Sequence, residues 1–229
     1  MRLLIYIITI TALTALLGGS FGRQTAKASS TDDRILGKVQ KISHPEQYIS
    51  RWGSILDNYR LIKHNNLQTS RTNAWKKFVH HLKDESPTKQ ILKVNLWLNS
   101  YPYKQDNWAY NTSDYWSTLG EFLDNGGDCE DFAIAKYLTL KYLGFDPNKM
   151  KIAIVYDTYS GTDHALLIVH HHNQTYVLDN RENMTVQNHY ADRYKAYYAF
   201  NEKQLWAYDQ PVIVRKLRDH NQAVLPGNR

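Results

Sequence analysis

The sequence contains a single cysteine, Cys129, in the segment 126–131, which reads Gly-Gly-Asp-Cys-Glu-Asp. The two glycines follow one predicted helix, and the acidic residues begin another. Unpaired backbone N–H groups at a helix start favour a thiolate over a thiol, so this position suits a nucleophile. A buried structural cysteine is the alternative, but three neighbouring carboxylates make a poor apolar site. We therefore interpret Cys129 as a candidate nucleophile.

His164 and Asp179 complete a candidate triad. His164 precedes one apolar run, Asp179 follows the next, and His-His-His-Asn at 170–173 joins the two runs, which predicts a β-hairpin. If His164 and Asp179 are directly opposed, the turn is centred between His171 and His172, and both side chains lie on one face of the sheet. For His164 taken alone, a core histidine with other partners is the alternative.

These residue types suit nucleophilic catalysis by a thiol. Imidazole can accept the thiol proton on one nitrogen while a carboxylate fixes its tautomer through the other. We expect Cys129 to attack an acyl carbon, His164 to protonate the leaving amine and Asp179 to orient the imidazole. The backbone N–H of Cys129 is the first candidate for an oxyanion donor. Trp116 either donates through its indole or walls the cleft, and we favour a wall.

Three acidic residues, Asp128, Glu130 and Asp131, flank the nucleophile. Their charges should raise the pKa of the thiol and so oppose the effect of the helix start. A calcium ion would resolve this conflict, because calcium prefers hard carboxylate and carbonyl oxygens. The alternative is that Asp128 caps the helix and the other two acids occupy its first turn. The histidines at 170–172 predict a solvated turn rather than a metal site, since three adjacent residues at a hairpin tip cannot converge on one ion.

The hydrophobic pattern predicts helices first and an antiparallel sheet second, hence an α+β fold. A capping-box pattern at 43–46 predicts that the first helix begins there, and 29–40 is expected to be loose. The segment 101–117 is predicted to be an ordered loop. The expected helices are 44–63, 73–83, 86–101, 118–125 and 129–143, the last of them the buried centre of the domain. The expected strands are 151–156, 165–169, 174–178, 197–200 and 205–208.

The N-terminus has the pattern of a secretory signal peptide, with a basic Arg2, an apolar run and small residues before Ser29. We predict cleavage after residue 28; an uncleaved anchor is the alternative. About 200 residues would remain, which we divide into an N-terminal helical subdomain at 29–100 and a catalytic core at 101–229. The formal net charge of +6 falls when the leader is removed. The sequence contains no basic stripe with interleaved aromatic residues, so nothing in it points to a nucleic-acid partner.

The motifs around Trp116, Glu121, Cys129, His164 and Asp179 together resemble those of the bacterial transglutaminase-like cysteine proteinases, among them the LapG-type periplasmic proteases. The resemblance extends over about 94–208, and Leu119 stands where a proline is expected in many relatives.

This resemblance implies a papain-like, transglutaminase-type core with Cys129, His164 and Asp179 as the triad, and calcium bound by Asp128, Glu130 and Asp131. It also implies a large cell-surface adhesin as substrate, cut near its N-terminus at a dialanine-containing site to release the cell from its biofilm. The implied partner is an inner-membrane LapD-type receptor, which sequesters the protease when cyclic-di-GMP is high.

Two other functions compete with peptide hydrolysis. Amide transfer uses the same triad but lets an amine, rather than water, resolve the acyl-enzyme. A binding module that keeps the fold without catalysis is the third reading, and the intact set of Cys, His and Asp argues against it.

Overall fold

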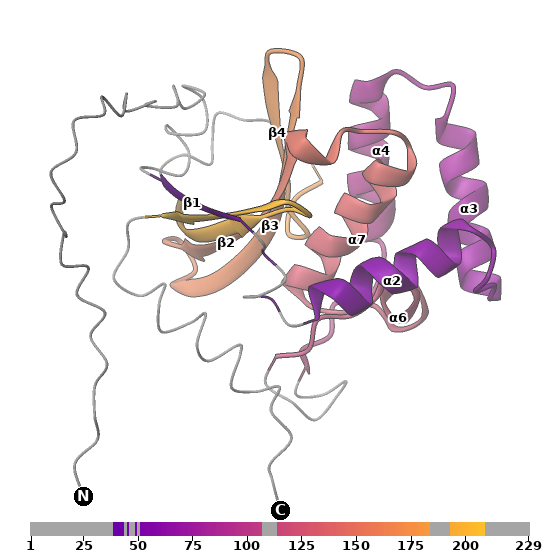
Figure 1. The fold of residues 1–229 in the computed structure, drawn as a ribbon, viewed down its shortest axis with the longest axis horizontal. Helices are drawn as coiled ribbons and strands as arrows, with labels where there is room; N and C mark the ends of the chain where they lie inside the picture. The colour runs from indigo at the N-terminus through magenta and orange to yellow at the C-terminus, as the bar shows by residue number, and fades with distance from the viewer. Residues whose placement is uncertain are drawn as a thin grey trace, which may run out of the picture.

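The computed structural model describes residues 39–43, 45, 49, 51–106, 114–183 and 193–208. The predicted signal peptide at 1–28 lies outside these residues. Within these residues, five helices gather on one side of an antiparallel sheet, which confirms the predicted α+β class (Figure 1). Among the helices described, none is both long and apolar enough to cross a membrane.

Local sequence signals explain where most of the helices begin. Thr69 caps α3, because its hydroxyl accepts the Thr72 N–H, and Thr118 and Glu121 form the predicted capping box of α6. Proline occupies the first turn of α4, where its missing N–H is harmless. The helices are α2 (Trp52–Lys63), α3 (Ser70–Leu82), α4 (Pro87–Asn99), α6 (Leu119–Asn125) and α7 (Cys129–Tyr142).

The start predicted for the first helix is wrong. Ser43, taken as its cap, is the last residue of a strand and pairs with Gln204, so the chain is still extended there. The Ile49 N–H donates to the Pro45 carbonyl at 3.0 Å, and α2 begins only at Trp52. Strand pairing therefore takes precedence over the local capping pattern.

The helix that starts at Cys129 is the buried centre of the molecule, as predicted. All residues from Asp131 to Leu140 on α7 are buried. It packs against α4 and α6 on one side and against two strands of the sheet on the other. The ring of Trp52 from α2 contacts both Tyr137 of α7 and Phe200 of the sheet, so helices and sheet share one apolar core. The division into subdomains at residue 100 stays a prediction.

The sheet has six antiparallel strands in the order β1-β6-β5-β2-β3-β4. The five predicted strands are all present, several of them longer than expected. The chain at 39–40 was expected to be loose, and that expectation is wrong, because β1 pairs with β6 along the edge of the sheet. The strands are β1 (Val39–Ser43), β2 (Met150–Asp157), β3 (Thr162–His171), β4 (Gln174–Leu178), β5 (Tyr194–Phe200) and β6 (Gln204–Tyr208).

The β3–β4 hairpin forms, but its register differs by two residues from the predicted one. Leu167 pairs with Leu178 and not with Tyr176, because the loop consists of His172 and Asn173. His172 adopts a left-handed φ of 52° in this turn. Side chains alternate between faces with a period of two, so a shift of two keeps every residue on its predicted face. The histidine and the aspartate of the candidate triad therefore remain on one side, offset along the strands rather than directly opposed.

Candidate active site

Cys129 is the first residue of α7, where α7 packs on β3. The side chain is half-buried, and its sulfur lies close enough to the backbone N–H of Ala165 for that N–H to lower the pKa of the thiol, against the larger effect of burial. Ala165 directly follows His164 in β3. The helix and the strand thus bring the candidate nucleophile to the residue that follows the candidate base.

His164 and Asp179 form a buried pair. Nε2 of His164 lies 2.8 Å from Oδ1 of Asp179, and both side chains are completely buried. A carboxylate can only accept, so the imidazole donates through Nε2. Nδ1 of His164 has no hydrogen-bond partner among the described residues. One nitrogen is therefore held by a carboxylate, and the other is left for a thiol proton.

Asp179 carries its negative charge in a buried position because three groups donate to it. Burial alone would raise its pKa, but the hydrogen bond and charge of His164, the hydroxyl of Tyr194 and the N–H of Arg181 together lower the pKa to about 2. The Arg181 N–H is 2.9 Å from Oδ1, and the Tyr194 hydroxyl is 2.6 Å from Oδ2. Asp179 therefore stays ionised well below neutral pH.

Helix α4 fixes the segment that follows β4. Nδ2 of Asn99 donates to the carbonyl of Asp179 at 2.9 Å, and Nδ2 of Asn95 donates to the carbonyl of Glu182 at 2.9 Å. The sequence analysis missed both asparagines. The available signal was their spacing, since two amides four residues apart on the apolar side of a helix predict buried hydrogen bonds.

Two tight backbone approaches explain the glycines before the nucleophile. Gly126 has φ of 78°, and a Cβ there would lie 2.1 Å from the carbonyl oxygen of Pro102. A Cβ on Gly127 would lie 2.1 Å from a carboxylate oxygen of Asp131. The chain at Gly127 also bridges to Tyr103, whose half-exposed ring stacks over Phe132. The loop before Cys129 is therefore held against the segment 102–104.

The acidic cluster is larger than predicted. Asp106 and Asp114, both from the 101–117 loop, bring carboxylate oxygens within 4.8 Å of Glu130, and Asp106 also approaches Asp128 and Asp131. One oxygen of Asp106 and one of Asp128 are buried without a hydrogen-bond partner in the described part of the chain. Asp106 and Asp114 were not predicted from the sequence, because only the fold brings their segment to the start of α7.

Burial and mutual repulsion disfavour charge in this cluster. Burial, followed by the charges of Glu130 and Asp131, raises the pKa of Asp128 to about 11. Burial and the charges of Glu130 and Asp114 raise the pKa of Asp106 to about 6. Oxygens that are close, buried and incompletely hydrogen-bonded fit a divalent cation with hard-ligand preference.

Asp131 differs from the other acids, because protein donors already surround it. Its carboxylate accepts the Ser117 N–H at 2.6 Å, the Ser117 hydroxyl at 3.1 Å and the Asp128 N–H at 3.2 Å. Asp131 lies in the first turn of α7 and ties the preceding loop to it. These contacts match the alternative reading of an acid that supports the helix start.

The carboxylates of the acidic cluster act on the thiol of Cys129, as the sequence suggested. Sγ of Cys129 donates to Oε2 of Glu130 at 3.1 Å. Burial, and then the charges of Glu130 and Asp128, raise the pKa of the thiol well above its ordinary value. The chain by itself therefore holds Cys129 as a neutral thiol bound to a neighbouring carboxylate.

Trp116 is packed into the core, and whether it forms a wall of the cleft stays a prediction. It is 4% exposed, stacks on Phe200 and donates its indole N–H to Asp114 at 2.9 Å. That donor is thus already engaged by a member of the acidic cluster. The backbone N–H of Cys129 stays the predicted oxyanion donor.

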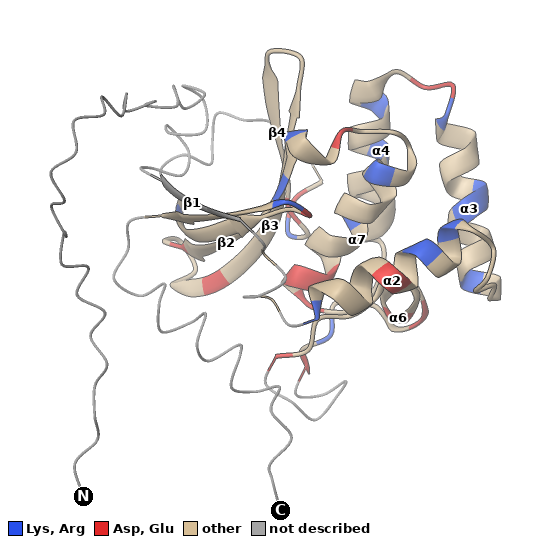
Figure 2. Cartoon of the chain, viewed as in Figure 1, with Lys and Arg blue, Asp and Glu red and all other residues tan. Residues whose placement is uncertain are grey.

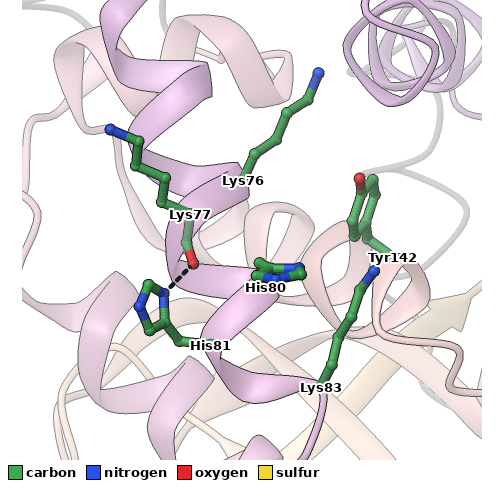
Figure 3. Close-up of a pocket in the computed structure, with 6 residues that line it drawn as sticks. All are labelled: Lys76, Lys77, His80, His81, Lys83 and Tyr142. Carbon is green, nitrogen blue, oxygen red and sulfur yellow. Dashed lines mark hydrogen bonds between the residues drawn. The ribbon is translucent and has the colours of Figure 1, made fainter.

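A separate cavity of about 300 Å³ lies far from this site (Figure 3). Its lining comes mainly from α3, a helix rich in lysine and arginine, and from Tyr142 at the end of α7 (Figure 2). Tyr142 lies thirteen positions after Cys129 on α7, a distance of about 20 Å at a rise of 1.5 Å per residue. The hairpin histidines line another cavity, of about 520 Å³, and belong to none of the possible metal-binding groups among the described residues.

The family model of the bacterial transglutaminase-like cysteine proteinases matches residues 57–210. The chain belongs to this family. It is therefore a cysteine protease, and the resemblance inferred from its motifs is confirmed. Among curated proteins, no relative matches the sequence.

Solved structures of LapG from Legionella pneumophila share the transglutaminase-like fold with this proteinase. The EGTA-treated form is 28% identical with a TM-score of 0.56, covering 68% of this chain and 86% of that one. The calcium-bound form is 26% identical with a TM-score of 0.56, covering 73% of this chain and 97% of that one. This chain is thus a LapG-like cysteine protease, and calcium is bound in the Legionella structure.

Proposed function

We propose that this protein is a calcium-dependent periplasmic endopeptidase that cleaves a large surface adhesin near its N-terminus with Cys129, His164 and Asp179. The observation that carries the triad is the buried hydrogen bond between His164 and Asp179. It leaves Nδ1 of His164 without a partner among the described residues, on the strand against which α7 packs. The position of the Cys129 sulfur beside the backbone N–H of Ala165, the residue after His164, supports the same assignment.

In the proposed reaction, Nδ1 of His164 accepts the thiol proton and the thiolate attacks the scissile carbonyl carbon. The resulting oxyanion is stabilised by the backbone N–H of Cys129 at the start of α7. The intermediate collapses as the imidazolium gives its proton to the leaving amine, which leaves a thioester on Cys129. Water then loses a proton to His164, attacks the thioester and releases the acid product, and the proton returns to the thiol. Asp179 stays ionised and holds the imidazole throughout.

The acidic cluster supports the proposal that calcium binds beside the nucleophile. Asp106, Asp114, Asp128 and Glu130 offer hard oxygens, and two of these residues carry buried oxygens without partners in the described part of the chain. We therefore propose these four as the principal ligands, while Asp131, named with Asp128 and Glu130 from the sequence, mainly supports the loop.

Bound calcium would supply positive charge that neutralises the carboxylates around the thiol. Glu130 would then no longer compete for the proton of Cys129, and His164 could accept it. The predicted rise in thiolate content gives calcium dependence a direct physical cause.

The remaining proposals on biology depend on the family resemblance. We propose export through the signal peptide at 1–28, cleavage at a dialanine-containing site of a biofilm adhesin, and sequestration by an inner-membrane LapD-type receptor that responds to cyclic-di-GMP.

The function is tested by incubating the protein with an adhesin fragment that contains the dialanine site, in calcium and in excess chelator. We expect two products in calcium, little cleavage in chelator, and none with Cys129→Ala. Cleavage that persists in the variant would remove the nucleophile assignment. A labelled amine is added in parallel, and its incorporation into the fragment would favour amide transfer over hydrolysis.

A further inference from the structure

We propose that Tyr194 is a positioning residue of the protease, whose hydroxyl holds the Asp179 carboxylate in the orientation that keeps His164 ready for the thiol proton. Tyr194 begins β5, and its hydroxyl donates to Oδ2 of Asp179 at 2.6 Å. The inference rests on the proposed triad and adds a residue to it.

The geometry divides the two oxygens of Asp179 between different tasks. Oδ1 accepts from Nε2 of His164 and from the Arg181 N–H, and Oδ2 accepts from Tyr194. Rotation of the carboxylate would break all three contacts together. The phenol therefore fixes which oxygen faces the imidazole, and so keeps the imidazole proton on Nε2.

Tyr194 is itself held rigidly. It is 3% exposed, and it pairs with Asp157 in the β2–β5 register. Asp157 is completely buried and binds Arg193, the residue before Tyr194, through Nε and Nη2, both at 3.0 Å. The same carboxylate binds Nη1 of Arg181 at 2.8 Å. One buried acid thus anchors both segments that donate to Asp179.

Tyr194 remains a donor at any working pH. Burial, and then its hydrogen bond to the Asp179 carboxylate, raise the pKa of the Tyr194 phenol well above its ordinary value. Its ring lies 6.0 Å from the imidazole of His164, between centroids, and does not reach the surface where a substrate would bind. Tyr194 therefore acts through Asp179 and not on the substrate.

The test is the rate at which iodoacetamide alkylates Cys129, the only thiol in the chain, at fixed pH in saturating calcium. Tyr194→Phe removes one hydroxyl and keeps the volume of the ring, so the fold should persist, which circular dichroism and thermal melting check. We expect alkylation to slow by about 10- to 100-fold, the range seen when a group that orients a functional ligand is removed.

Tyr176→Phe is the matched control. Tyr176 is a buried tyrosine of β4 whose hydroxyl also donates a hydrogen bond, to Gln174, but it lies toward the hairpin tip, away from the triad. We expect wild-type alkylation from this variant. A loss shared by both variants, or no loss from Tyr194→Phe, would overturn the proposal.

A double-variant experiment separates positioning from general stabilisation. If Tyr194 acts through Asp179, adding Tyr194→Phe to Asp179→Ala should slow alkylation no further. If the two substitutions instead slow alkylation independently, so that their fold-changes multiply, the positioning role of Tyr194 is refuted. If instead the wild-type thiol reacts no faster than free cysteine and His164→Ala changes nothing, the triad itself is refuted, so the two failures can be told apart.

Discussion

Lys136 provides a quantitative test of how deeply α7 is buried. This lysine lies two helical turns after Cys129, is 1% exposed, and has its ammonium 5.8 Å from the centre of the Phe132 ring. Burial lowers its pKa from 10.5 to about 7, even though the nearby Asp179 charge acts in the opposite direction. In the unfolded chain the pKa of Lys136 is about 10.4. Between about pH 7 and about pH 10.4, folding therefore makes the ammonium of Lys136 lose its proton.

The sign of the effect follows from proton linkage. Between these two pKa values the unfolded chain binds more protons than the folded one, so stability rises with pH. The stability that Lys136 adds by being neutral is fully present above the pKa of the unfolded chain. It is lost as pH falls through the folded pKa of about 7. Integrating from about pH 7 to about pH 9.5, with the folded pKa at about 7, gives about 3 kcal/mol of added stability from Lys136 alone.

The assay compares wild type with Lys136→Met by urea unfolding at both pH values. Methionine keeps a similar length without the charge, and other titrations cancel in the difference between the two proteins. We expect the wild type to gain about 3 kcal/mol more than the variant on going to the higher pH, and the variant to be the more stable of the two near pH 7. Equal gains in both proteins would show that Lys136 keeps an ordinary pKa and is not buried as described.

Two further predictions concern buried acids. Asp157→Ala leaves two arginines without their shared carboxylate, so it should lower stability by about 2–4 kcal/mol in urea unfolding and also slow Cys129 alkylation. An unchanged midpoint would show that this ion pair is dispensable. Asp106→Asn removes one of the repelling charges, so it should raise the melting temperature in chelator and reduce the further rise caused by calcium. A full calcium response in this variant would exclude Asp106 as a ligand.

The elements of the fold were largely readable from local patterns. The Thr118–Glu121 capping box and Ser86-Pro87 mark helix starts that the structure reproduces, because these signals act within one turn. The edge strand β1 and the late start of α2 were not readable, because β6, the partner of β1, lies more than 160 residues further along the chain. Long-range pairing decides such segments, and local propensity does not reveal it.

The candidate site likewise combines features that local sequence patterns predict with features that depend on contacts between distant segments. The face shared by His164 and Asp179 followed from the two-residue period of strands, and it survived an error in the register. The partners that complete the site, Tyr194 on Asp179 and Asp106 in the acidic cluster, come from distant segments with no motif around them. The residues of the candidate triad could therefore be named from sequence motifs. The residues that orient Asp179 or add charge beside Cys129 could be found only from the fold.

The central claim is that Cys129 forms the covalent intermediate of peptide cleavage. Rapid acid quenching of the calcium-loaded protein with an adhesin fragment, followed by mass spectrometry of the Cys129 peptide, tests it directly. The account predicts a thioester between this residue and the N-terminal product, absent from Cys129→Ala and scarce in His164→Ala. An unmodified Cys129 peptide during active turnover, or an acyl group on another residue, would contradict it.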